Sequence, residues 1–164
     1  MKQTLATARD AFVASMKRET TGPELTRLVA VLDDLIKWSV ARPKALAFRG
    51  DGASSVFGFQ LAGSSTMFWS ARVTRGDAPT LEIYPPTGRN LSAELREKVK
   101  ETLNANSRQP TADDRGLRIG FGALKNPNAR QAVLAQLEEL TRCAPAVPNV
   151  TSATGSATAV AATA

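Results

Sequence analysis

The sequence predicts an α+β fold in which helices flank an antiparallel sheet of four to five strands. Six of the nine aromatic residues fall in a meander of residues 45–84, in four short runs where apolar residues alternate with polar or small ones. Alternation is typical of half-buried strands, because successive side chains point to opposite faces of a sheet. Before and after the meander, apolar residues recur at spacings of three and four, which indicates helices. The expected order is ααββββαβα.

The first helix is expected over residues 3–18. Its apolar stripe consists of Leu5, Ala8, Phe12 and Met16. The second helix has the stronger pattern. Thr21 and Glu24 match a capping box, in which the two residues satisfy each other's backbone N–H groups, and Pro23 suits a first turn. This helix should end before Pro43, because the residue that precedes a proline disfavours helical geometry.

Four apolar runs define the meander, and turn-forming residues separate them. The runs occupy residues 46–48, 57–61, 67–73 and 81–83, and the turns lie at 50–52, 63–65 and 76–77. Glycine and aspartate suit these turns because they tolerate the positive φ angles of tight hairpins. The sheet is therefore expected to be antiparallel.

After the meander, a third helix should begin at Asn90 or Ser92 and run to about Leu103. Residues 104–114 have the composition of a loop, and residues 116–121 alternate again as a fifth strand. A last helix should begin near Asn126. Its inward residues are Val133, Leu137 and Leu140.

Residues 1–143 are interpreted as a single domain and residues 144–164 as a disordered tail. The tail consists mainly of alanine, threonine and serine and has no charged or aromatic residue. Such a composition cannot bury enough surface to offset the entropy lost on ordering.

Composition restricts the chemistry that this chain can perform. Histidine is absent and Cys143 is the only cysteine. Catalytic arrangements built on histidine are therefore excluded, as are zinc sites built on histidine or on several thiolates. We predict no catalytic residue, no metal site and no cofactor, and we expect that the protein is not an enzyme.

Three weaker motifs in the sequence have simpler explanations than a functional site. Asp113-Asp114 has oxygen ligands suited to a divalent cation, but a solvated loop explains it more simply. Residues 120–125 have the position of a phosphate loop, but most such glycines only shape a strand-to-helix turn. Glu82-Ile83-Tyr84 lacks the lysine of a magnesium-dependent nuclease.

The net charge of +6 favours an acidic partner, and much of the surplus lies in the first 50 residues. The N-terminus has no apolar segment of signal-peptide length, and no stretch is long and apolar enough to span a membrane. A cytoplasmic location without membrane contact is therefore expected.

The favoured function is a small non-catalytic binding module that contacts nucleic acid through a basic surface with an exposed aromatic residue. If Trp69 and Ala71 face the core, alternation turns Phe68 and Arg72 outward on the third strand. The candidate residues are Arg42, Lys44, Arg49, Phe68, Arg72 and Arg118. The basic residues would contact phosphates, and Phe68 would be the platform on which a base stacks.

The alternative is an adaptor for protein–protein interaction or homo-oligomerisation, without nucleic-acid contact. The weakly amphipathic first helix would dock on a partner or on a second copy. An outermost strand, either 81–84 or 117–121, would accept another strand. Joint exposure of Phe68 and Arg72 separates the two hypotheses, because helices on both faces of the sheet would leave only net charge in favour of nucleic acid.

Overall fold

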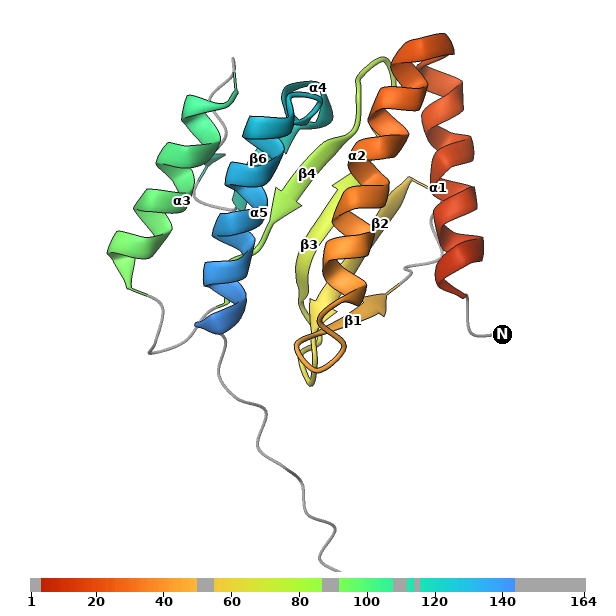
Figure 1. Ribbon diagram of the computed structural model, residues 1–164. Helices are drawn as coiled ribbons and strands as arrows, with labels where there is room; N and C mark the ends of the chain where they lie inside the picture. Colours follow the sequence, from red (N-terminus) through yellow and green to blue (C-terminus); the bar gives the residue numbers. More distant parts are fainter. Residues whose placement is uncertain (1–3, 50–54, 87–91, 108–111, 114–115, 144–164) are drawn as a thin grey trace, which may run out of the picture.

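The computed structural model describes residues 4–49, 55–86, 92–107, 112–113 and 116–143. Within these ranges the chain forms the predicted α+β fold (Figure 1). In chain order, the elements are α1 (Leu5–Glu19), α2 (Gly22–Val40), β1 (Leu46–Arg49), β2 (Val56–Leu61), β3 (Met67–Arg72), β4 (Thr80–Ile83), α3 (Ala93–Ala105), β5 (Ala112–Asp113), β6 (Gly116–Gly120), α4 (Phe121–Leu124) and α5 (Pro127–Arg142). The two-residue strand β5 lies within the predicted loop, and the single-turn helix α4 follows the predicted fifth strand. The predicted disorder of residues 144–164 lies outside the described residues.

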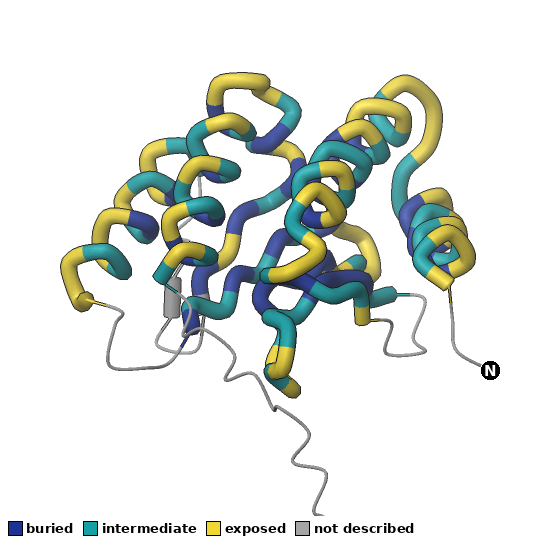
Figure 2. Tube along the Cα trace, turned by 60° about the horizontal axis from the view of Figure 1, so that its bottom comes forward, coloured by how far each residue is buried: buried dark blue, intermediate teal, exposed yellow. Residues whose placement is uncertain are grey.

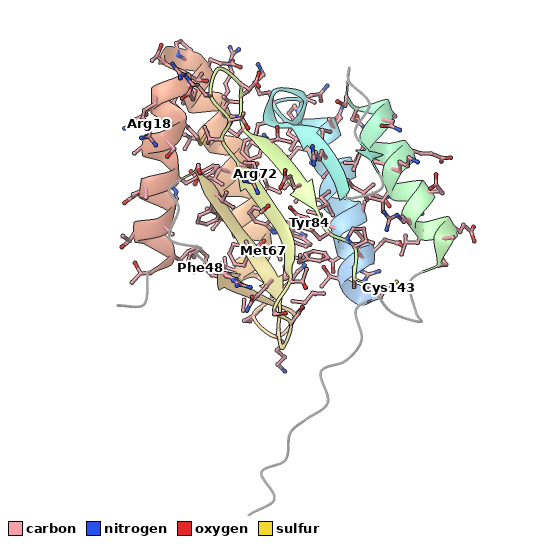
Figure 3. The ribbon with its side chains drawn as sticks, turned by 180° about the vertical axis from the view of Figure 1, so that it is seen from behind. Arg18, Phe48, Met67, Arg72, Tyr84 and Cys143 are labelled. Carbon is pink, nitrogen blue, oxygen red and sulfur yellow. The ribbon has the colours of Figure 1, made fainter. Side chains whose placement is uncertain are left out.

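The sheet is antiparallel throughout, in the spatial order β1-β2-β3-β4-β6-β5. The long helices lie on one face of it, so the described part of the chain has two layers (Figure 1). The opposite face is seen from behind in Figure 3, with no helix in front of it. β4 lies between β3 and β6, and β6 lies between β4 and the two-residue β5, which it contacts at Gly116 and Leu117. Neither is therefore the outermost strand, which was the condition for it to accept a strand from a partner.

Helix α1 packs on its own sheet. Thr4 caps it by accepting a hydrogen bond from the Thr7 N–H, and Ala8, Phe12 and Met16 are buried. The ring of Phe12 lies 6.0 Å from that of Phe57 on β2. The apolar stripe of α1 is thus used inside the domain, which contradicts the expectation that this helix docks on a partner.

Helix α2 is the centre of the helical layer, and its charged residues connect it to its neighbours. Asp33 accepts two hydrogen bonds from Arg9 of α1, at 2.7 and 2.8 Å. Asp34 pairs with Arg130 of α5 at 2.9 Å. These partially exposed pairs hold the helices in one arrangement more than they stabilise the fold, because screened ion pairs each contribute little.

The predicted capping box at the start of α2 does not form. Thr21 is the N-cap residue, but its side chain makes no capping hydrogen bond. Glu24 instead accepts a hydrogen bond from Lys125 Nζ at 2.6 Å, just beyond α4. A tertiary ion pair has therefore replaced the local interaction that the sequence suggested.

The core lies between the helices and the sheet, where Trp69 packs against Phe57 and Phe59. The Trp69 indole N–H donates a hydrogen bond of 2.9 Å to the Ser39 hydroxyl of α2, and both residues are buried. This bond satisfies a polar group that would be costly to bury alone. Figure 2 shows buried positions along the strands and on the helix sides that face them, while the outer helix surfaces are exposed.

A β-bulge in β3 interrupts the alternation of its side chains. Phe59 pairs with Trp69, but the next residue, Gln60, pairs with Met67, so Phe68 is an extra residue on β3. A bulge of this kind places two consecutive side chains on the same face. Phe68 accordingly lies on the helix side with Trp69, fully buried and stacked on Trp38 with 6.5 Å between ring centroids. The prediction that Phe68 points outward is therefore wrong.

Gly58 permits the close approach of β2 and β3 beside this bulge. A Cβ atom at Gly58 would collide with the Trp69 carbonyl oxygen and lie 2.9 Å from the Ser70 Cα. It would also lie 2.6 Å from the Met67 Cε, which means that the Met67 side chain crosses the sheet over Gly58. Backbone contacts as short as these cannot be relieved by rotating a side chain.

Gly58→Ala should therefore destabilise the protein, by about 1–3 kcal/mol or more. Gly122→Ala is the matched control, because a Cβ there meets no heavy atom within 4 Å. Urea unfolding followed by circular dichroism measures both free energies. Equal stability of the two variants would contradict the close spacing of β2 and β3 at Gly58.

Candidate nucleic-acid interface

One row of residues crosses the sheet on the face turned away from the helices, which we call the open face. The residues opposite one another on β1, β2, β3, β4 and β6 are Arg49, Gly58, Ser70, Glu82 and Arg118. Directly opposed side chains share a face. Arg72 lies two residues along β3 from Ser70 and thus on the same face, as Figure 3 shows. Antiparallel pairing therefore brings together three of the predicted arginines, Arg49, Arg72 and Arg118.

Glu82 is the centre of the charged cluster on the open face. Its Oε1 atom lies 3.5 Å from Arg72 Nε and 3.7 Å from Arg118 Nε. Its Oε2 atom accepts a hydrogen bond of 2.7 Å from the Tyr84 hydroxyl. The glutamate side chain is 12% exposed, whereas the two arginines are 48% and 50% exposed. Two accessible guanidinium groups thus share one largely buried carboxylate.

Tyr84 lies just beyond β4, where its backbone N–H donates to the Phe68 carbonyl at 2.9 Å. Burial raises the pKa of Tyr84, and its hydrogen bond to the Glu82 carboxylate raises that pKa further. A hydrogen bond with Ser70 and the charge of Arg72 act in the opposite direction. The phenol is therefore held in its protonated form as a donor to Glu82.

Arg49 lies toward the β1 edge of the open face. One of its terminal nitrogens donates to the Ser65 carbonyl, in the turn between β2 and β3, and lies 3.4 Å from the Gln60 side-chain oxygen. These contacts direct its guanidinium along β2 toward the β2–β3 turn, at the opposite end of the strands from Arg72.

The other predicted basic residues do not join this cluster. Arg42 donates from Nε to Glu138 of α5 at 2.7 Å, and its guanidinium carbon lies 4.2 Å from the Trp38 ring centroid. It therefore connects α2 to α5 in the helical layer. Lys44 is exposed in the turn between α2 and β1. The structure thus separates the predicted set into an open-face group, a helix-layer residue, a turn residue and the buried Phe68.

Glu82, Tyr84 and Ser70 were not among the residues predicted from the sequence, although a signal for them was present. Leu81 and Ile83 alternate with Glu82 and Tyr84, and this pattern predicts that the two polar residues share one face. What the pattern lacked was the strand order, which places Arg72 and Arg118 on either side of them.

The glycine-containing segment of residues 120–125 forms a turn from β6 into α4. Phe121 is buried and begins α4, and Lys125 is paired with Glu24. Among the described residues, no group of three or more aspartate, glutamate or cysteine side chains is arranged to hold a metal ion. Nor is any helix in the described ranges long and apolar enough to cross a membrane.

Comparison with protein-family models, with curated proteins and with solved structures finds no match. Function is therefore inferred from the side chains of the open face. Guanidinium groups bind carboxylates and phosphates through paired N–H donors, so this face is suited to an anionic ligand.

Because Tyr84 is the only tyrosine, the near-ultraviolet absorbance of tyrosinate reports on this residue alone. We expect its midpoint to lie above the ordinary value of 10.0 and to fall in Glu82→Gln, because the variant loses the negative charge that disfavours phenolate. Folding favours the protonated phenol, so its contribution to stability is complete below about pH 10 and is lost as pH rises through the folded-state pKa. An unchanged midpoint in Glu82→Gln would contradict the Tyr84–Glu82 hydrogen bond.

Phe68→Ala should destabilise the fold by about 3–5 kcal/mol, because it removes a buried ring that stacks on Trp38. Val40→Ala is the control, since Val40 is 46% exposed and should change stability by about 0.5 kcal/mol or less. Denaturant unfolding compares the two variants. A small effect of Phe68→Ala would contradict its burial and restore the interpretation of an outward platform.

Proposed function

We propose that this protein is a small non-catalytic module that binds nucleic acid on the open face of its sheet. The observation that carries the proposal is the alignment of Arg49, Arg72 and Arg118 on the face of the sheet that no described helix covers. Basic side chains that contact phosphates supply affinity without sequence preference. The net charge of +6 favours the same class of partner.

The dimensions of the row fit an extended strand of nucleic acid. Arg49 and Arg118 are separated by four strand spacings, or about 19 Å, which is the length of several nucleotides. No described helix projects from this face, so the face offers no helix to the major groove of a duplex. A flat face with basic residues favours a single strand laid across it.

In this proposal Tyr84, and not Phe68, is the aromatic platform on which a base stacks. It is the aromatic residue of the cluster on the open face, where Figure 3 shows it on the same side of the sheet as Arg72 and Met67. Bases stack on aromatic side chains whatever their sequence, with about 1–3 kcal/mol for each stacked base. Because the hydroxyl of Tyr84 is tied to Glu82, its ring is held in place before a base arrives.

Phe68 and Arg72 are not exposed together, because Phe68 is buried, so the observation that was to separate the two hypotheses does not favour nucleic acid. The nucleic-acid hypothesis now depends on the arginines of the open face and on net charge. The adaptor hypothesis has lost its suggested docking surfaces, because the apolar stripe of α1 is buried in the domain, β4 lies between two strands, and β6 lies between β4 and the two-residue β5. A protein partner becomes the preferred interpretation if no nucleic acid binds. A cytoplasmic location remains a prediction from the sequence.

The test is fluorescence anisotropy of labelled oligothymidylate, titrated with the protein across a salt series. We expect Arg72→Ala and Arg118→Ala each to weaken binding by about three- to tenfold and to reduce the salt slope by about 0.7. Arg27→Ala is the matched control, because Arg27 is exposed on α2 in the helical layer. Thermal unfolding of each variant checks that the fold is retained.

Two results would contradict the proposal. The first is the absence of binding to single-stranded or duplex nucleic acid at low salt. The second is an equal loss of affinity in Arg27→Ala and Arg72→Ala, which would mean that only net charge matters. Tighter binding to the duplex than to the single strand would retain the open face but reject the extended single strand.

A further inference from the structure

The contacts of Glu82 divide between its two carboxylate oxygens. Arg72 and Arg118 approach one oxygen from neighbouring strands on either side, while Tyr84 donates to the other oxygen. The carboxylate thus lies between two cations and is held from a third side by a neutral donor.

The two arginine contacts are long for charge-assisted hydrogen bonds. Their N···O distances are 3.5 and 3.7 Å, whereas such bonds typically span about 2.7–2.9 Å. In the same protein, Arg9 and Asp33 form a bidentate pair with two short hydrogen bonds, of 2.7 and 2.8 Å. Neither contact with Glu82 is therefore a short directional hydrogen bond, and charge attraction is the main component of both.

We propose that Arg72 and Arg118 together bind one phosphate of the nucleic acid. In the free protein Glu82 is their counter-ion, and the phosphate displaces it. The inference rests on the proposed function and deepens it. A phosphate presents several acceptor oxygens in the open, so both guanidinium groups can bind it through paired donors. A carboxylate that is 12% exposed offers them one oxygen at long range.

Tyr84 makes this exchange possible. When the arginines turn to a phosphate, Glu82 keeps its 2.7 Å hydrogen bond from the Tyr84 hydroxyl. The carboxylate is then not left buried without a partner, which would be costly. Glu82 thereby keeps the two arginines close together in the free protein and lowers their affinity for phosphate.

The proposal predicts that removing the charge of Glu82 tightens binding. In Glu82→Gln, the amide oxygen still accepts from Tyr84, but the competitor for the guanidinium groups is neutral. Affinity for oligothymidylate should rise about two- to fivefold, and the salt slope should become steeper by about 0.7. Measured by anisotropy, this is the reverse of the loss expected for the arginine variants.

The matched control is Glu97→Gln. Glu97 lies on α3 in the helical layer and its side chain is 60% exposed, so the substitution makes the same change in net charge away from the open face. A selective gain in Glu82→Gln supports the proposal. An equal gain in both variants, or no gain or a loss in Glu82→Gln, overturns it while leaving nucleic-acid binding by the wild type intact. Failure of both wild type and Glu82→Gln to bind overturns the proposed function as well.

A second measurement uses the wild type and does not depend on how Glu82→Gln folds. The charge of Arg72 lowers the pKa of Tyr84 in the free protein. If Arg72 moves to a phosphate, the pKa of Tyr84 should rise when oligodeoxyadenylate binds; this ligand is chosen because its bases, unlike thymine, do not ionise in the same pH range as tyrosine. A pH titration followed by NMR of isotope-labelled tyrosine, with and without oligodeoxyadenylate, measures this shift. Binding without any rise in the pKa would overturn the displacement of Glu82.

Discussion

The bulge at Phe68 determines which side chains reach each face of the sheet. One additional residue in β3 turns Phe68 into the helical layer against Trp38 and leaves Met67 opposite Gln60. Gly58 makes the arrangement possible, because a side chain there would meet the backbone of β3. Because Phe68 lies in the core, the open face carries the arginines, Glu82 and Tyr84, with the Met67 side chain lying over Gly58 among them.

The ion pairs of the helical layer are shorter than those on the open face of the sheet. In the helical layer, oppositely charged residues form short pairs such as Arg9–Asp33 and Lys125–Glu24, which connect α2 to its neighbours. On the open face, Arg72 and Arg118 share Glu82 at longer distances. Ion pairs between helices fix an arrangement, whereas the two arginines around Glu82 are each about half exposed to solvent. This contrast is the physical basis for placing function on the sheet.

Local patterns in the sequence predicted the helices and strands well, because periodicity reports directly on which side chains are buried. The Ser92 cap of α3, which accepts from the Leu95 N–H, and the turns at Gly63 and Gly76, with φ of 80° and 81°, followed from local chemistry. The predicted capping interaction of Glu24 was wrong because Lys125, 101 residues away along the chain, competes for the same carboxylate. The predicted outward orientation of Phe68 was wrong because alternation cannot show where an extra residue enters a strand.

The sequence by itself determined the α+β class, the order of elements, the absence of histidine chemistry and the basic balance, since each depends on composition or on neighbours along the chain. Only the tertiary structure decided that Arg49, Glu82 and Arg118 stand in one row, because that depends on the register of five strands. It also decided that Arg42 belongs to the helical layer, where Glu138 of a distant helix binds it. Contacts between residues far apart in sequence leave no local pattern, and the candidate site is built almost entirely from such contacts.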